Sequence, residues 1–160
     1  MNTSICTESV WPITGILNLQ AYNEQNKLLW KASSHNLIVA SGYASVAKAI
    51  SGVQNSYIAK IAIGTNGNPA KETDTSITNA VLIDILNIEY PKPAVVRFYF
   101  EIGFEEANGM NIREFGLLTK DGQLFSRKVR ETIEKTQDYR IFGIWDYLEK
   151  GFSHNWDHHA

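Results

Sequence analysis

The stretch that most constrains the fold covers residues 112–135, where two apolar segments flank the pair Asp121-Gly122. An Asp-Gly pair between such segments is a strong signal for a two-residue β-hairpin, because both central residues of a type I′ turn need a positive φ. With this pair as the turn, Glu114 and Arg127 become diagonal neighbours on one face. The sequence therefore predicts an antiparallel hairpin in which these two side chains are able to form an ion pair.

Both faces of the predicted hairpin carry apolar side chains, although an isolated hairpin normally buries only one face. The core of the domain covers one face. Two alternatives remain for the other face, which either meets a helix or long loop of the same chain or meets another subunit. Exposed apolar patches usually mark interfaces. The candidate contact residues are Leu118, Phe125 and Val129 on one face and Phe115, Leu117 and Leu124 on the other.

Most of the chain outside this hairpin alternates polar and apolar residues with a period of two, which is typical of half-buried β-strands. Turn residues such as Asn108-Gly109 separate these segments roughly every ten residues. This spacing favours an antiparallel β-sandwich or barrel-like domain with about seven or eight strands. The further predicted strands cover residues 13–22, 27–33, 57–64, 81–90, 94–106 and 138–149.

One segment, residues 40–52, has the spacing of a short α-helix instead. Ser41 is placed to cap its N-terminus, and Gly52 stands where a helix would end. The segment is rich in alanine, so we expect its apolar face to pack closely on a sheet. The residues that recur at helical spacing on this face are Tyr43, Val46, Ala47 and Ile50.

The length and composition of the chain are those of one globular domain. Its 160 residues include 44% hydrophobic and 20% charged side chains, and the formal net charge of −2 argues against a nucleic-acid surface. No apolar run reaches the about 20 residues that span a bilayer, so we expect no membrane insertion. The first residues show no secretory signal, so we expect synthesis in the bacterial cytoplasm without a signal peptide. The expected layout is an N-terminal segment (1–12), one β domain (13–149) and a C-terminal tail (150–160).

The sequence lacks the usual signatures of an active site. It has no nucleophile elbow, no His-Glu-x-x-His motif and no Cys-x-x-Cys pair, and Cys6 is its single cysteine. Residues 64–71 are weakly similar to a phosphate-binding loop but lack the Gly-Lys-Ser/Thr ending. Carboxylates on strands usually form a solvated edge, and those close together in this sequence are Glu101, Glu105, Glu106 and Glu114. We therefore expect neither catalysis nor a cofactor.

Two groups of residues leave binding functions open. Five aromatic side chains either pack in the core and rim or form a platform that stacks sugars, and they are Trp11, Tyr22, Trp30, Tyr139 and Trp145. In the tail, Phe152 and Trp156 are candidate anchors of a docking peptide. We expect no metal site, but the candidate ligands for one are His154, His158 and His159. The tail can equally be an incidental end of the chain.

Four stretches resemble, in the same order, a family of bacteriophage and prophage tail proteins. They read HNLIVASGYASVAKAISG, IAIGTNGNPAKETDTSITNAV, EANGMNIREFGLLTKDGQLFSRKVR and IEKT, and residues 106–127 form the most specific piece. The similarity extends over residues 13–148. The family resembles tail-fibre, collar or baseplate-associated components of virions and tail-like particles. Within these stretches we expect turn, cap or register roles for Gly64, Asp74, Asn108, Gly109, Glu114, Gly116, Gly122 and Arg127.

The resemblance implies a structural protein that works by assembly, with no catalytic or ligand residues to carry over. Tail components are commonly cyclic oligomers, so the expected partners are further copies of this chain, for example in a trimer, and other tail, fibre or baseplate proteins. The expected location is the virion tail or a tail-like particle. Because no shaft or receptor-binding tip follows the domain, we expect an oligomeric adaptor or attachment domain at the fibre or baseplate. The alternative is a carbohydrate-binding β module for surface recognition.

Overall fold

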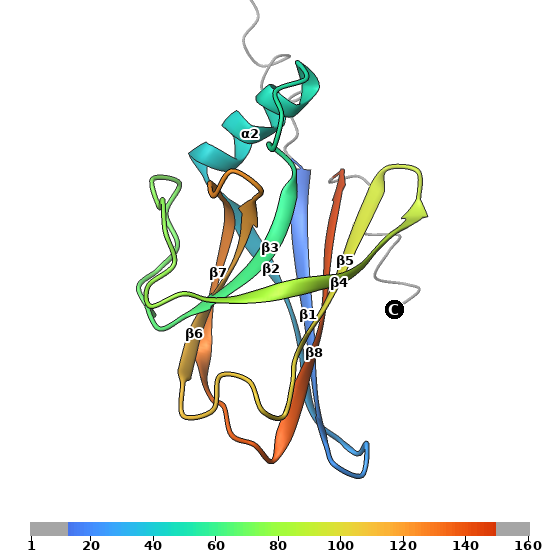
Figure 1. Cartoon of the computed structure of the whole chain (residues 1–160), viewed down its shortest axis with the longest axis vertical. Helices are drawn as coiled ribbons and strands as arrows, with labels where there is room; N and C mark the ends of the chain where they lie inside the picture. The colour runs from blue at the N-terminus through green and yellow to red at the C-terminus, as the bar shows by residue number, and fades with distance from the viewer. Residues whose placement is uncertain (1–12, 150–160) are drawn as a thin grey trace, which may run out of the picture.

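The chain folds into antiparallel strands with a single short helix, which confirms the predicted fold class (Figure 1). A computed structural model describes residues 13–149. Every predicted strand is present within this range, and the two arms of the hairpin are β6 and β7. The elements are β1 (Ile13–Asn23), β2 (Leu28–Ile38), α2 (Ala40–Ile50), β3 (Ile58–Gly64), β4 (Val81–Lys92), β5 (Val95–Ile102), β6 (Asn111–Thr119), β7 (Leu124–Glu134) and β8 (Tyr139–Glu149).

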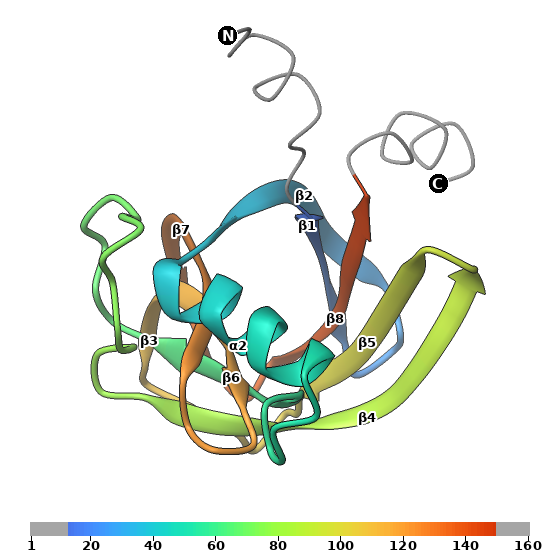
Figure 2. The same ribbon diagram turned by 90° about the horizontal axis from the view of Figure 1, so that it is seen from above.

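The strands form a closed barrel in the order β1-β2-β7-β6-β3-β4-β5-β8, and two of them change partner along their length. β2 pairs with β1 over most of its length and reaches β7 only through Leu37 and Ile38. β4 pairs with β3 through residues 81–84 and with β5 from Ile85 onward. The barrel therefore consists of two sheets joined at two corners, β2 and β4. Figure 2 shows the barrel from above, with α2 lying across this end.

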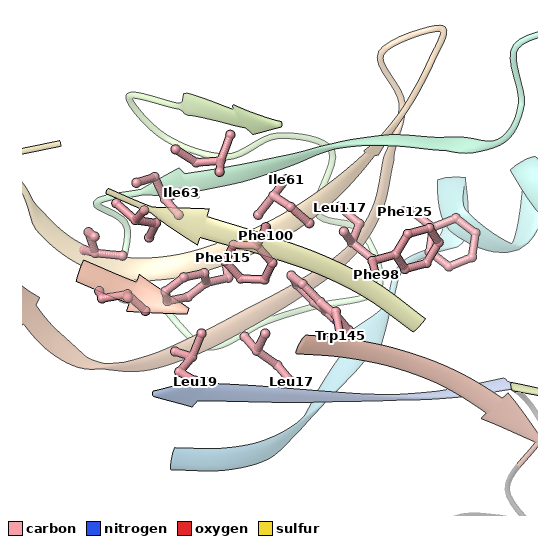
Figure 3. Packing of buried hydrophobic residues seen from close by; sticks show 14 of the residues in the cluster. Leu17, Leu19, Ile61, Ile63, Phe98, Phe100, Phe115, Leu117, Phe125 and Trp145 are labelled. Atoms are coloured by element: carbon pink, nitrogen blue, oxygen red, sulfur yellow. The ribbon is translucent and has the colours of Figure 1, made fainter. Parts of the chain in front are cut away.

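The core lies between the two sheets and is built from the inward residues of the alternating strands (Figure 3). Leu17 and Leu19 of β1 are buried there, as the period of two in the sequence predicts. Phe100 and Phe115 meet with ring centroids 6.5 Å apart, and Trp145 is completely buried beside them. Full burial of one large apolar side chain contributes about 1.5–3 kcal/mol, so this cluster is the main driving force for closing the barrel.

The β6–β7 hairpin differs from the predicted register near its turn. Gly122 has φ +90°, whereas Asp121 is not among the residues with positive φ, so the predicted type I′ turn is wrong. The N–H of Gly122 donates to Thr119 O at 2.9 Å, and the N–H of Thr119 donates to Gln123 O at 2.9 Å. This is a three-residue loop, with a type I turn followed by a left-handed glycine.

A bulge after this turn decides which side of β7 faces the core. Gly116 lies opposite Arg127 as predicted, but Leu118 lies opposite Leu124 instead of Phe125. Phe125 is the extra residue, and its ring packs into the core against Tyr147, edge to face, at a centroid distance of 5.4 Å. The two predicted apolar faces are therefore mixed, because one bulge exchanges Phe125 and Leu124 between them.

The outer face of the hairpin is covered by the loop of residues 65–80. Ile77 of this loop is buried and packs in one small cluster with Leu124. Gly64 and Gly116 leave space for the side chain of Ile77. A Cβ on Gly116 would lie 2.7 Å from Ile77 Cδ1, and a Cβ on Gly64 would contact Ile77 Cγ2. Both faces of the hairpin thus meet the chain itself, the inner face at the core and the outer face at this long loop.

Three charged side chains hold this loop on the sheet, and we call Asp74, Glu114 and Arg127 the loop clamp. Arg127 Nε donates to Glu114 Oε1 at 2.8 Å, and Arg127 Nη1 donates to Asp74 Oδ2 at 2.9 Å. Arg127 Nη2 donates to Asn66 O at 3.0 Å. Glu114 Oε2 accepts the backbone N–H groups of Asn66 and Thr78 at 2.8 and 3.0 Å. Glu114 and Arg127 are buried, so each needs the other because an unpaired buried charge is costly.

The helix ends where the sequence predicts but begins differently. Gly52 follows the helix with φ +85°, and its N–H donates to Ala49 O at 3.1 Å. The predicted cap by Ser41 is wrong, because Val39 precedes the first turn and makes no side-chain cap bond. Ser41 lies inside the helix, and its hydroxyl donates to Leu124 O at 2.5 Å. The helix is thereby fastened to the first residue of β7.

The prediction of which side chains form the buried face of the helix is largely wrong. Its buried residues are Gly42 and Ser45, whereas Tyr43 and Ile50 are exposed. The reason is the position of α2 across the end of the barrel, where small side chains permit close approach to the β7 backbone and the large ones turn to solvent.

Breaking the loop clamp is expected to destabilise the domain strongly. In Arg127→Met the carboxylate of Glu114 stays buried without its cation, so the free energy of unfolding should fall by about 3–5 kcal/mol. Urea denaturation followed by tryptophan fluorescence measures this change.

The matched control is Lys60→Met, which breaks an ion pair with Asp84 whose two side chains are 44% and 78% exposed. An exposed pair contributes only about 0–1 kcal/mol. Equal losses in the two variants would show that the loop clamp does not hold the loop as described.

Candidate functional site

Large apolar side chains gather on the outside of the barrel along β4. Leu86, Ile88 and Tyr90 are 62%, 44% and 73% exposed. Leu82 of the same strand and Tyr57, just before β3, are more than half exposed as well. We call these five residues the β4 surface. Scattered exposed apolar residues are normal, but several on one strand mark a contact site.

The position of β4 at a corner of the barrel explains this exposure. Its pairing with β3 ends at the pair Lys60 and Asp84, after which β4 turns to β5. No strand among the described residues pairs with the β3-facing edge of β4 beyond Asp84. In Figure 1, β4 crosses in front of the other strands at this place. An irregularity between Ile85 and Asn87 places Leu86 outside the regular pairing with β5. The result is a free strand edge that carries apolar side chains, a form that readily pairs with another chain.

A groove of about 860 Å³ accompanies this free edge. One wall is formed by the start of β3, from Tyr57 to Lys60, and the other by β4 from Asp84 to Ile88. The exposed ion pair of Lys60 and Asp84 closes one end. The groove is lined by apolar side chains together with Lys60, Asp84, Asn87 and Lys120, and it suits the burial of a side chain or strand from a partner.

The residues that the sequence predicted as a contact patch do not belong to the β4 surface. Four of them are buried within the domain, so their side chains are not accessible on its surface, namely Phe115, Leu117, Leu124 and Phe125. Leu118 and Val129 are half-buried. Phe152 and Trp156 lie outside the described residues. The sequence did carry a signal for the β4 surface, because residues 81–90 place apolar side chains on both faces of one strand.

Of the aromatic residues considered for sugar stacking, Trp30 and Tyr139 line one hollow between β2 and β7 together with Glu134, and Tyr22 does not line it. Trp145 is completely buried, and Trp11 lies outside the described range. Tyr22, Trp30 and Tyr139 are half-buried. A cation already lies over one face of each of these three rings, and the cation-to-centroid pairs are Arg140 to Tyr22 at 4.8 Å, Arg130 to Trp30 at 5.3 Å and Lys135 to Tyr139 at 5.6 Å.

The carboxylates are also engaged separately. Glu101 accepts a hydrogen bond from Arg140 at 2.7 Å, and Glu106 accepts the N–H of Gly103 at 2.9 Å. Glu105 is exposed. Burial raises the pKa of Asp146, an effect that the Arg97 guanidinium opposes through bonds of 2.8 and 3.0 Å. These described carboxylates form separate contacts and do not meet as a catalytic pair.

The loop that is weakly similar to a phosphate-binding loop already holds an anion of its own. Its N–H group at Asn66 and the N–H group of Thr78 both point to Glu114 Oε2. Backbone amides arranged in this way suit a negative group. The similarity to a phosphate loop therefore has a structural origin, because the carboxylate of Glu114 occupies the position that such amides create.

A network of hydrogen-bonded side chains lies among the apolar residues of the barrel interior. The hydroxyl groups of Tyr147 and Ser126 form a short hydrogen bond. Asn36 Nδ2 donates to Tyr147 Oη at 2.9 Å, and Trp145 Nε1 donates to Asn36 Oδ1 at 3.2 Å. Burial raises the pKa of the Tyr147 phenol well above its ordinary value of 10.0, partly offset by the bond to Ser126. This network of hydrogen bonds links the two sheets through the core.

This burial predicts a pH dependence of stability at the alkaline end. The pKa of Tyr147 is raised in the folded state, so its contribution to stability is present below pH 10.0 and is lost as the pH rises above that value. The free energy of unfolding of the native chain, minus that of Tyr147→Phe, should fall by at most about 1.4 kcal/mol per pH unit. Denaturant titrations at several alkaline pH values measure the difference, and a constant difference would contradict the assignment.

The described residues contain no group of three or more His, Cys, Asp or Glu side chains that could hold a metal ion. The candidate ligands His154, His158 and His159 lie outside that range. Of the helices in the described part of the chain, none is long and apolar enough to cross a membrane. Comparison of the chain with protein-family models, with curated proteins and with solved structures finds no match.

Proposed function

We propose that the chain is a structural component of a phage tail or tail-like particle, where it acts as an oligomeric adaptor or attachment domain at the fibre or baseplate. The observation that carries the proposal is the β4 surface, an exposed apolar strand with a free edge. The ordered sequence resemblance to tail proteins supplies the context. The virion tail or tail-like particle is the proposed location, and bacterial cytoplasm without a signal peptide is the proposed place of synthesis.

The β4 surface supports assembly in two ways. Burial of Leu86, Ile88 and Tyr90 against a partner would remove apolar area from water, at roughly 25 cal/mol per Å². The free edge of β4 would add backbone hydrogen bonds, which fix the register of the contact. Together these features combine affinity with a defined geometry, as an adaptor requires.

Repetition of this contact would produce the required strength. In a trimer or ring one modest interface is formed several times, and each contact raises the effective concentration for the next. The partners would be further copies of the chain and neighbouring tail, fibre or baseplate proteins. This mechanism needs neither a cofactor nor a reactive side chain.

The alternative function, a carbohydrate-binding module, has weaker support. Trp145 is taken up by the core. The rings of Tyr22, Trp30 and Tyr139 each have one face occupied by a cation, which leaves less aromatic surface for a sugar. Binding of neutral oligosaccharides to a glycan array would favour this alternative.

Self-association through the β4 surface is tested by light scattering over a range of protein concentrations. We expect a mass above the 18.0 kDa of one chain and a dissociation constant that rises about tenfold or more in Leu86→Glu, since a buried charge opposes the contact. The matched control is Leu28→Glu, which changes an exposed leucine outside the β4 surface and should leave the mass unchanged. A strictly monomeric native chain would contradict the oligomer.

The location in a tail is tested by the genes beside the one that encodes this chain. Adjacent genes for sheath, tube, baseplate or fibre proteins would support it. A neighbourhood without any such gene, together with absence of the chain from purified particles, would contradict it.

A further inference from the structure

The second corner of the barrel, between β2 and β7, is open along most of its length. In the part of the chain that the structure describes, these strands pair only at Leu37 with Arg127 and at Ile38 with Ser126. Beyond these pairs, residues 28–36 of β2 and 128–134 of β7 belong to strands whose facing edges have no partner. In Figure 2, β2 lies near β7 where it leads into α2 and is farther from β7 at its other end. We call this opening the β2–β7 seam.

Two adjacent hollows follow the seam. One, of about 430 Å³, lies between His35 and Lys128, and the other, of about 490 Å³, lies between Trp30 and Arg130. The inward positions of β2 along the seam hold Trp30 and Asn36 and, between them, the small residues Ala32 and Ser34, opposite Leu19 and Leu17 of β1. At Ala32 and Ser34 the small side chains of β2 do not fill the space along the seam, whereas large apolar residues fill the core between the two sheets.

The seam carries positively charged side chains that form no ion pair with the described residues. Lys31 comes from β2, and Lys128 and Arg130 come from β7. None of the three forms an ion pair with any described residue. Arg130 is half-buried, and its guanidinium is held over the ring of Trp30 at 5.3 Å. Glu134 is the acidic residue that lines the same hollow, so positive charge is in excess there.

Partial burial of Arg130 makes its positive charge energetically costly. Burial lowers the pKa of Arg130, and the nearby carboxylate of Glu131 opposes that change. A partly buried cation that forms no ion pair is only partly compensated by a nearby carboxylate, and an incoming anion would add to that compensation. The charge thus indicates an anionic ligand, while the unpaired edge of β2 indicates how its backbone is held.

We propose that the β2–β7 seam is an acceptor for an extended, acidic peptide segment of a partner protein. The segment adds as a strand to the free edge of β2 and places carboxylates beside Lys31, Lys128 and Arg130. Strand addition satisfies those backbone N–H and C=O groups of residues 28–36 that do not face β1, which a sugar does not do in register. Binding by stacking is disfavoured because Arg130 occupies one face of Trp30.

This inference does not depend on the proposed tail function or on the β4 surface. The seam and the β4 surface lie at different corners of the barrel, formed by different strands. A monomeric chain is still expected to bind the peptide, and an oligomer formed through β4 leaves the seam available. The tests of the two proposals can therefore fail separately.

The experiment selects peptides from a displayed library of random 12-residue sequences against the full chain. We expect enrichment of alternating sequences rich in Asp and Glu, and saturable binding of the synthetic peptides by fluorescence anisotropy. The double variant with Lys31→Glu and Lys128→Glu should weaken binding about tenfold or more, because repulsion replaces attraction. The matched control, Lys48→Glu on the exposed helix end, should leave affinity unchanged. Thermal melting verifies that both variants fold.

A backbone test separates strand addition from simple charge attraction. N-methylation of alternate peptide residues should abolish binding in one phase and not in the other, because only every second N–H faces the β2 edge. The amides of residues 28–36 that face away from β1 should become protected from hydrogen exchange in the complex. The proposal is overturned if no acidic peptide binds, if charge reversal has no effect, or if N-methylation is tolerated in both phases. It is also overturned if oligogalacturonate, an acidic sugar, binds at the seam where the peptides do not.

Discussion

The buried contact between Arg127 and Glu114 is the interaction on which the outer surface of this barrel depends. It joins two neighbouring strands, and its remaining hydrogen-bonding groups hold the backbone of the loop of residues 65–80. A buried ion pair of this kind need not add much net stability, because its desolvation is costly. Its effect is specificity, since only one position of the loop satisfies both charges. With the loop in place, Ile77 covers Gly64 and Gly116, and the apolar outer face of the hairpin is closed.

Closing that face shifts the available contact surfaces to the corners of the barrel. β2 and β4 each belong to both sheets, and a strand that changes partner leaves part of its edge unpaired. The two corners differ in chemistry, because β4 presents Leu86, Ile88 and Tyr90 whereas the β2–β7 seam presents unpaired cations. The same topological requirement thus yields one apolar and one basic surface, and an assembly protein can use them for different partners.

Much of the fold follows from local patterns that the sequence displays directly. Alternation over β1, β5 and β8 identifies strands and their inward residues, because each strand has one face in the core. Gly122 and Gly52 mark the ends of elements through their positive φ. The pairing of Glu114 with Arg127 was also predictable, since their spacing around the turn makes them neighbours. Its burial was not, because the covering loop is distant in sequence and its position depends on Asp74 and Ile77.

The sequence by itself determined a mainly antiparallel β domain with one short helix, the position of its hairpin, and a pair of opposite charges within it. These depend on short-range periodicity and turn chemistry. Only the tertiary structure decided that Phe125 turns inward, that Ser41 binds Leu124 O, and that Leu124 is covered while Leu86 is exposed. Each of these outcomes depends on which distant segment fills the space beside a residue. Apolar residues occur on both faces of β4 and of the hairpin alike. The clamped loop covers those of the hairpin, whereas no strand among the described residues pairs with the β3-facing edge of β4 beyond Asp84, so the side chains there stay exposed.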